Sequence, residues 1–172
     1  MQSKKLTYHE FGDIMNKTIE EWLNEYGESH QNPTNKLIHW ICVPLIMLSL
    51  IGLLSSIPNN FKIVIGSNTF LLNWSMIFLF FASLYYLKLS RTLFIGMILV
   101  SFLLLYSVEI MKSYDIVLWH LSIGIFILAW IGQFIGHKIE GIKPSFFKDI
   151  QFLLIGPAWL LSFIYKKLNI PI

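Results

Sequence analysis

Long apolar runs constrain this sequence more than any other feature. Four of them are close to the length of about 20 residues that a helix needs to cross a bilayer. They cover residues 37–57, 70–87, 92–111 and 116–136. In lipid, every backbone polar group has to be paired within the protein, and a helix pairs these groups within one segment. The sequence therefore predicts an all-α, polytopic membrane helix bundle with four transmembrane helices.

The composition agrees with this interpretation. Hydrophobic residues make up 55% of the 172 residues and charged residues 13%, which is about half of the roughly 25% typical of soluble domains. The net charge of +3 is small and dispersed, so we expect no nucleic acid partner. The single cysteine, Cys42, excludes an internal disulfide and is expected to be a small buried hydrophobe. We expect one integral-membrane domain over residues 1–172.

Two further segments flank the spans. Hydrophobic residues recur at helical spacing between residues 5 and 28, with charged residues at most other positions. This pattern predicts an amphipathic helix within a cytoplasmic segment, residues 1–36. The apolar stretch 151–165 is short for a span and contains Gly156 and Pro157. We expect it to be re-entrant or interfacial, with a fifth C-terminal helix as the alternative.

Lysine and arginine residues predict the orientation. With residues 151–165 re-entrant, eleven basic residues share the side of the N-terminal segment and two lie on the other side. If that stretch crosses the membrane, the division becomes nine to four. Both termini are therefore expected in the cytoplasm. The expected location is a bacterial inner membrane, or the endoplasmic reticulum if the source is eukaryotic.

This topology divides the five histidines. His30 and His39 lie at the start of the first span, and His137 lies at the end of the fourth, so an even number of crossings returns it to the same side. His120 precedes His137 by 17 residues on one predicted helix, which is roughly 25 Å. We therefore expect His120 at the opposite interface, and His9 to be solvated or interfacial.

Three imidazoles and the carboxylate of Glu140 can converge at one membrane surface. Glu140 follows His137 by three residues, which places both on one helical face. Imidazole with carboxylate is typical of iron, zinc or manganese sites, and two histidines with one carboxylate suit mononuclear non-haem Fe(II). Interfacial histidines that bind no metal are the alternative. The sequence has no H-x-x-x-H or H-x-x-H-H motif of the kind found in di-iron lipid enzymes.

Other catalytic motifs are absent from the sequence. It contains no G-x-S-x-G, no P-loop, no H-E-x-x-H and no dinucleotide fingerprint. Gly132 and Gly136 form a G-x-x-x-G motif, which we interpret as helix packing. Glu109, near the far end of the third span, is expected to be interfacial, with Lys112 as a partner for an ion pair.

The residues around the histidines form two motifs. The first is YGESHQNPTNKLIHW followed by VP, and the second is WIGQFIGHKIEGIKPSFFKDIQFLLIGPAWL. Together they resemble the membrane 2-hydroxy-fatty-acid dioxygenase family of fatty-acid α-oxidation, over about residues 20 to 165. The matching residues are Tyr26, His30, Asn32, Pro33, Asn35, Ile38, His39, Pro44, Trp130, Gln133, Phe134, Gly136, His137, Glu140, Pro144 and Pro157. One departure is KIEGIKP, where the family has a Phe before the Glu and a more Arg-rich run.

The resemblance implies an Fe(II)-dependent dioxygenase. Its substrates would be O2 and a 2-hydroxy fatty acid, which it would convert to the fatty acid one carbon shorter while the acyl chain rests among membrane lipid and apolar spans. His30, His39 and His137 would be the metal ligands. Glu140 would be a fourth ligand, or an acceptor that fixes an imidazole tautomer.

Further roles are expected around these ligands. Asn35 and Gln133 each lie one turn before a histidine, and each could hold that histidine or the substrate hydroxyl. Lys36 and Lys138 are candidates for the substrate carboxylate, with a role as flanking positive charges as the alternative. Tyr26 either covers the site or anchors the chain at the interface.

Two other classes of function stay open on the sequence alone. One is a non-catalytic membrane scaffold or lipid-binding protein, with the histidines merely interfacial. The other keeps the metal site but makes the protein a zinc-dependent lipid hydrolase. The sequence does not determine the oligomeric state.

Overall fold

The computed structural model describes residues 17–58, 61–65, 68–141 and 152–172. Most of these residues are helical, and a short antiparallel hairpin accompanies the helices. The elements are α2 (Ile19–Glu28), α3 (Pro33–Ser56), β1 (Lys62–Ile65), β2 (Asn68–Leu71), α4 (Trp74–Leu89), α5 (Arg91–Lys112), α6 (Leu118–Glu140) and α8 (Ile155–Lys167). Three helices, α3, α5 and α6, are long and apolar enough to cross a membrane. The all-helical architecture predicted from the sequence is confirmed.

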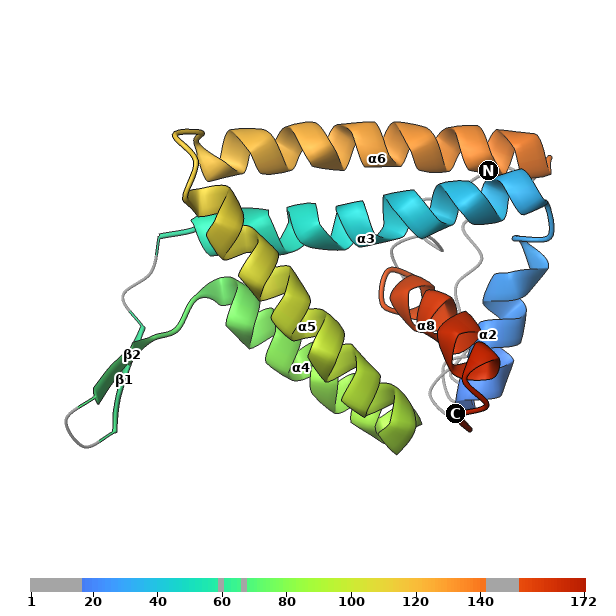
Figure 1. Cartoon of the computed structure of the whole chain (residues 1–172), viewed down its shortest axis with the longest axis horizontal. Helices are drawn as coiled ribbons and strands as arrows, with labels where there is room; N and C mark the ends of the chain where they lie inside the picture. Colours follow the sequence, from blue (N-terminus) through green and yellow to red (C-terminus); the bar gives the residue numbers. More distant parts are fainter. Residues whose placement is uncertain (1–16, 59–60, 66–67, 142–151) are drawn as a thin grey trace, which may run out of the picture.

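The longest helices, α3 and α6, lie side by side and antiparallel along the length of the molecule (Figure 1). They contain 24 and 23 residues, so each is about 35 Å long. The α4–α5 pair crosses α3 obliquely, while α2 and α8 lie together near the start of α3 (Figure 1). The start of α3 and the end of α6 therefore share the end of the bundle at which α2 and α8 pack.

The second predicted span begins later than expected. Residues 70 and 71 belong to β2, and α4 begins only at Trp74. The side chain of Asn73 determines this start, because it accepts a hydrogen bond from the backbone N–H of Met76 and so caps the helix. The predicted span therefore starts four residues before the helix, and α4 has 16 residues, or about 24 Å. The other three predicted spans agree with helices to within four residues at each end.

The predicted continuous helix over residues 5–28 is wrong, because the described chain is not helical at Thr18. Thr18 has an extended backbone, and its side chain accepts a hydrogen bond from the backbone N–H of Glu21. The Glu21 carboxylate in return accepts one from the N–H of Thr18 at 2.7 Å. Because this capping box ends helical geometry, α2 begins at Ile19. The part of the prediction before residue 17, including His9, lies outside the described residues.

The C-terminal apolar stretch forms the short helix α8. Its 13 residues extend about 20 Å, and it packs against α2, α3 and α5. Two hydroxyl groups fix its position, since Tyr86 Oη donates to the Leu154 carbonyl at 2.7 Å and Tyr165 Oη donates to the Thr92 carbonyl at 2.8 Å. A re-entrant or interfacial placement of residues 151–165 in the membrane stays a prediction, and residue 151 lies outside the described residues.

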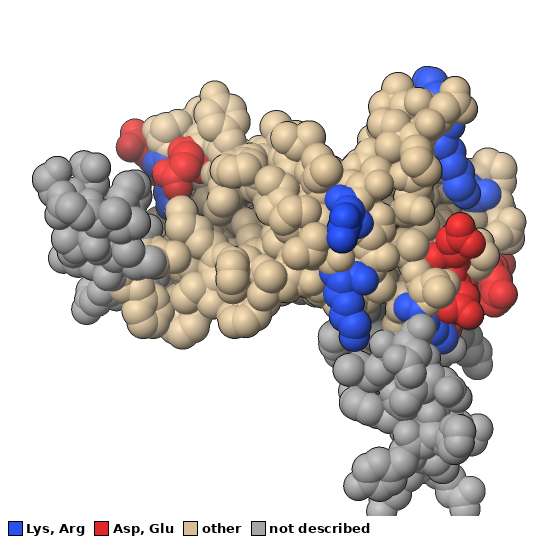
Figure 2. Space-filling model, turned by 90° about the horizontal axis from the view of Figure 1, so that it is seen from below, with Lys and Arg blue, Asp and Glu red and all other residues tan. Residues whose placement is uncertain are grey.

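Apolar side chains cover the outside of the long helices. Large exposed hydrophobic residues include Leu99, Phe102 and Leu103 on α5 and Leu128 on α6. Figure 2 shows the acidic and basic side chains gathered in groups, with a broad face free of them between the groups. An apolar face of this kind suits lipid rather than water, in agreement with a membrane protein.

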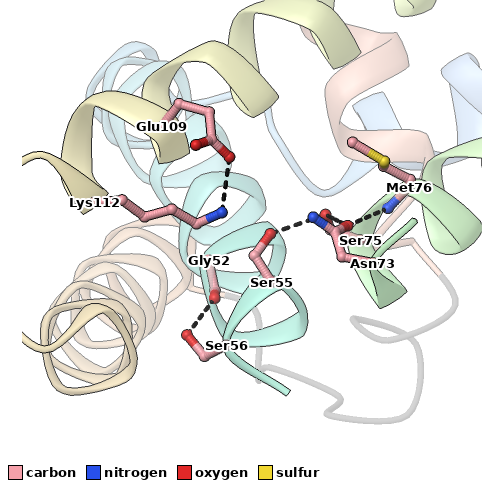
Figure 3. Close-up of polar contacts among 8 residues, drawn as sticks. All are labelled: Gly52, Ser55, Ser56, Asn73, Ser75, Met76, Glu109 and Lys112. Carbon is pink, nitrogen blue, oxygen red and sulfur yellow. Dashed lines mark hydrogen bonds and ion pairs between the residues drawn. The ribbon is translucent and has the colours of Figure 1, made fainter. Parts of the chain in front are cut away.

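The end of α3 farther from α2 and α8 is joined to α4 by polar side chains (Figure 3). Ser55 Oγ donates to Ser75 Oγ at 2.9 Å, and Ser75 in turn donates to the Asn73 side chain. On α5, Lys112 and Glu109 form the expected ion pair at 2.7 Å, and the Glu109 side chain is 64% exposed. Each of these five side chains therefore has a structural partner at this end.

Glycine allows α3 and α6 to approach closely near their shared end. A Cβ atom added at Gly132 would lie 2.5 Å from the Cys42 Sγ, and one at Gly136 would lie 2.3 Å from the Asn35 Oδ1. Both distances are shorter than real contacts, so the G-x-x-x-G motif packs directly on α3. This close approach sets the last turns of α6 against the first turns of α3.

A leucine at Gly132 is expected to lower the free energy of unfolding by about 1–3 kcal/mol, because the added side chain overpacks the α3–α6 contact. Gly124→Leu on the same helix is the matched control, since a Cβ there meets nothing within 4 Å. Denaturant unfolding in detergent, followed by circular dichroism, measures both variants. Equal destabilisation by the two substitutions would contradict the close-packed seam.

Candidate metal centre

Three histidines from distant parts of the chain meet where α3 begins and α6 ends. His30 lies in the loop between α2 and α3, His39 in the second turn of α3 and His137 in the last turn of α6. One ring nitrogen of each lies within 4.8 Å of the others. Their exposed fractions are 2%, 1% and 7%, respectively. The structure thus brings the three candidate ligands together in one buried cluster.

The loop that contains His30 is short, and the residues that follow His30 favour the start of α3. The Asn32 side chain accepts a hydrogen bond from the backbone N–H of Thr34 at 2.9 Å and caps α3. Pro33 occupies the first helical position, where its fixed φ favours helix initiation. Only residues 29–32 separate α2 from α3. His30 is therefore held beside the first turns of α3.

Two backbone carbonyl groups determine how His30 and His39 face each other. The Tyr26 carbonyl oxygen is 2.5 Å from His30 Nδ1, and the Asn35 carbonyl oxygen is 3.0 Å from His39 Nδ1. Because a carbonyl oxygen can only accept, we assign a proton to each Nδ1 atom. Each neutral ring then presents the lone pair of Nε2. The two Nε2 atoms are 2.8 Å apart.

This arrangement of the two rings fits a metal ion. Two nitrogen lone pairs at 2.8 Å repel each other unless a cation or a shared proton lies between them. Nitrogen ligands about 2.1 Å from a metal are separated by about 3 Å when they occupy neighbouring positions. With His137 as a third imidazole, the donor set suits iron or zinc. The residues present therefore fit a mononuclear metal centre.

The protonation state of His30 agrees with a ligand role. Burial lowers the pKa of His30 to about 4, and the proximity of His137 adds to this effect, while the Tyr26 carbonyl acts in the opposite direction. His30 is therefore neutral at pH 7. Neutral imidazole is the form that binds a metal.

Glu140 joins the end of α6 to the loop that carries His30. Its carboxylate accepts hydrogen bonds from the backbone N–H of Gln31 at 2.7 Å, the backbone N–H of Asn32 at 3.0 Å and Asn35 Nδ2 at 2.9 Å. The N-terminus of α3 also favours a negative charge through its helix dipole. Among the described residues, the group that could hold a metal consists of the three histidines. Glu140 thus lies beside the cluster, where its carboxylate is hydrogen-bonded to amide groups.

Asn35 and Gln133 are buried beside His39, with exposed fractions of 0% and 5%. Asn35 contributes through two groups, since its backbone carbonyl binds His39 and its side chain binds Glu140. The side chain of Gln133 contacts the His39 ring. Its Nε2 atom has no hydrogen-bond partner in the described part of the chain. A free donor is therefore available next to the cluster.

Aromatic rings cover His30 from the side of α2 and α8. The Tyr26 ring stacks on His30, with centroids 4.3 Å apart and planes at 10°. Trp159 of α8 lies 5.2 Å from His30 and 5.3 Å from Tyr26, between ring centroids. The sequence analysis predicted Tyr26 either as a cover over the site or as an interface anchor, and it missed Trp159. A signal existed, because Trp159 and Phe163 recur at helical spacing in an apolar stretch.

Three further residues singled out in the sequence are not members of the cluster. Lys36, in the first turn of α3, lines a cavity that also touches His30. Lys138 is exposed on α6 and does not line that cavity. The His120 ring lies against Trp119 at the opposite end of α6, with centroids 3.6 Å apart.

Comparison with known proteins assigns the chain to a family. The family model described as 2-hydroxy-palmitic acid dioxygenase Mpo1-like matches residues 16–168. One relative, the 2-hydroxy-palmitic acid dioxygenase MPO1 of Saccharomyces cerevisiae, is 28% identical over 147 residues, which cover 84% of this chain and 78% of the yeast protein. No solved structure gives a significant match.

The match extends over nearly the whole described chain. It includes every element from α2 onward, except the last few residues after α8, and thus all three clustered histidines. The resemblance seen in the two sequence motifs is confirmed. The chain belongs to the Mpo1-like family.

Proposed function

We propose that this protein is an Fe(II)-dependent dioxygenase that converts a 2-hydroxy fatty acid to the fatty acid one carbon shorter. The observation that carries the proposal is the pair of Nε2 atoms that face each other at 2.8 Å beside a third buried imidazole. The family membership and the name of the yeast relative support the substrate class.

The proposed reaction balances without a further reductant. A 2-hydroxy acid, R–CH(OH)–COOH, reacts with O2 to give R–COOH, CO2 and H2O. The bond between the carboxyl carbon and C2 breaks, and the four electrons lost by the acid reduce O2 to the level of water. Iron, when bound, would supply the one-electron chemistry that triplet O2 requires. No 2-oxoglutarate or nicotinamide is needed as a source of electrons.

The protein residues would position this chemistry. His30, His39 and His137 would hold the metal, and the carbonyls of Tyr26 and Asn35 would keep protons on Nδ1 so that Nε2 stays a ligand. Three ligands leave open positions at which a 2-hydroxy acid can chelate through its hydroxyl and carboxylate oxygens.

Two further residues would act around the ligands. Gln133 Nε2, which has no partner in the described chain, would donate a hydrogen bond to the bound hydroxy acid. Glu140 would hold the His30 loop against the end of α6. Residues that orient metal ligands without binding the metal act in this way. Asn35 would connect these parts, because it binds both His39 and Glu140.

The location of the cluster suits a membrane-borne substrate. The histidines lie at one end of the candidate spans α3 and α6, so the acyl chain can stay in the apolar layer while its head reaches the site. We place this end and both termini on the cytoplasmic side, as the lysine and arginine distribution predicts. Labelling of a Lys167→Cys variant from either side of the membrane would test this placement.

Iron-loaded protein in detergent is expected to consume one O2 for each 2-hydroxypalmitate, with pentadecanoate and CO2 formed in equal amounts. Oxygen-electrode measurements with mass spectrometry of the products check this stoichiometry. Palmitate, which lacks the hydroxyl, is the control and should give no oxygen uptake. Stoichiometric iron without any oxygen uptake on 2-hydroxy acids of several chain lengths would contradict the proposal.

A zinc-dependent lipid hydrolase is the second candidate. The observation in its favour is that the described metal-binding group contains three histidines and no carboxylate, a set that also occurs in catalytic zinc sites. Zinc as the native metal, with ester hydrolysis and no oxygen uptake, would establish this function instead. Absence of any metal from iron-supplemented preparations would favour a scaffold or lipid-binding role.

A further inference from the structure

We propose that Lys36 and Lys166 line the binding site of the substrate carboxylate, so that they select a fatty acid over an uncharged lipid. The site is a cavity of about 350 Å³ next to the histidine cluster, within the size range of small-ligand sites. This inference rests on the proposed function for the identity of the ligand. It concerns recognition of the head group and is tested by binding, without turnover.

The cavity opens beside the metal ligands. Its walls come from α2, the His30 loop, the first turn of α3 and α8, and His30 itself forms part of the wall. A molecule held there is next to a candidate metal ligand. The cavity is therefore a suitable approach to the cluster for the head of an acid.

Two lysines from different helices line this cavity. Lys36 comes from the first turn of α3 and Lys166 from the last turn of α8. Within the described residues, ion pairs occur at Lys17 and Lys112 and at neither of these lysines. Both ammonium groups are therefore available to a ligand, and each offers three hydrogen-bond donors.

Within the described lining, the acidic side chain is that of Glu28, which is exposed. The two lysines outweigh Glu28 and leave this lining with a net positive charge. An anion is therefore favoured over a neutral or cationic head group. Lys138, the other lysine expected at the carboxylate, is not part of the lining.

Part of the cavity wall is aromatic. Trp159 and Phe163 lie edge to face, with ring centroids 4.7 Å apart, and both line the cavity. Such rings suit the first methylene groups of an acyl chain. Lysine side chains and aromatic rings in one cavity match a molecule with a carboxylate head and an apolar tail.

The test compares binding of radiolabelled 2-hydroxypalmitate with binding of its methyl ester to the iron-loaded protein in nanodiscs under argon, which prevents turnover. Wild type is expected to prefer the acid. Lys36→Ala and Lys166→Ala should each weaken acid binding by about fivefold, as expected for partly exposed ion pairs, and leave ester binding unchanged. The double variant should lose the preference, and Lys→Arg variants should retain it.

Two further variants sharpen the comparison. Glu28→Gln removes the opposing charge and should tighten acid binding by about twofold. Lys167→Ala is the matched control, because Lys167 is the exposed neighbour of Lys166 and does not line the cavity. Its affinity for the acid should equal that of wild type. Iron content and circular dichroism confirm that each variant is folded.

The outcomes separate this inference from the proposed function. Lysine-dependent preference for the acid supports the inference even if no oxygen is consumed. Equal binding of acid and ester by wild type, or an unchanged preference in the double variant, overturns it. Lysine-dependent binding of short-chain phosphatidylglycerol that 2-hydroxypalmitate does not displace would assign the cavity to a lipid phosphate, and it overturns the inference as well.

Discussion

His137→Ala is expected to reduce the iron content of the purified protein from near one equivalent to a trace, and to abolish oxygen uptake on 2-hydroxypalmitate. The physical reason is that His137 is the proposed ligand from α6, while His30 and His39 come from the loop before α3 and the second turn of α3. With two imidazoles left, the site has too few protein ligands to hold the metal through purification. Inductively coupled plasma mass spectrometry measures the iron directly.

The matched control for this variant is His120→Ala. His120 lies on the same helix but at its opposite end, against Trp119, so the substitution should leave iron content and oxygen uptake unchanged. His30→Ala and His39→Ala should behave like His137→Ala. Full iron content in all three cluster variants would rule out the ligand assignment.

Glu140→Ala is expected to have the second largest effect, on both folding and metal affinity. The substitution leaves two backbone N–H groups and the buried Asn35 side chain without their acceptor. In general, each hydrogen bond to a charged group stabilises the folded state by about 1.5–3 kcal/mol. The partial exposure of Glu140 reduces this contribution. We expect a loss of about 2–3 kcal/mol in the free energy of unfolding.

The same substitution should weaken metal binding by about 10- to 100-fold, as is typical of residues that orient ligands without touching the metal. Glu140 holds the loop of His30 and, through Asn35, the residue whose carbonyl fixes His39. Competition with a chelator of known affinity measures the change. Glu109→Ala is the control, because that carboxylate binds only Lys112 among the described residues. Unaltered metal affinity in Glu140→Ala would leave Glu140 with a purely structural role.

The parts of the fold that could be predicted follow from local sequence patterns and from the number of membrane crossings. Apolar length determines where the helices lie, and an even number of crossings returns His137 to the side of His30 and His39. The break at Thr18 was also present in the sequence, because Thr18 and Glu21 have the spacing of a capping box. The helical periodicity before and after it obscured the break.

Other features depend on contacts that no local pattern contains. Residues 68–71 are a strand because they pair with β1, whereas their apolar character alone suited the start of a span. The partners of Glu140 are two backbone amides in the loop before α3 and the side chain of Asn35, all more than 100 positions away in the chain. The place of Lys166 beside His30 depends on how α8 packs on α2.

The bond between Glu140 and Gln31 spans 109 positions of the chain, and this separation orders the events of biosynthesis. The ribosome has to complete α6 before His137 can reach the other two histidines. A nascent chain that has inserted only α3, α4 and α5 holds two of the three proposed ligands and lacks the Glu140 carboxylate that binds the His30 loop. At the proposed centre, stable metallation would therefore follow the insertion of α6. Iron occupancy would then report that this last long helix has entered the membrane in the correct direction.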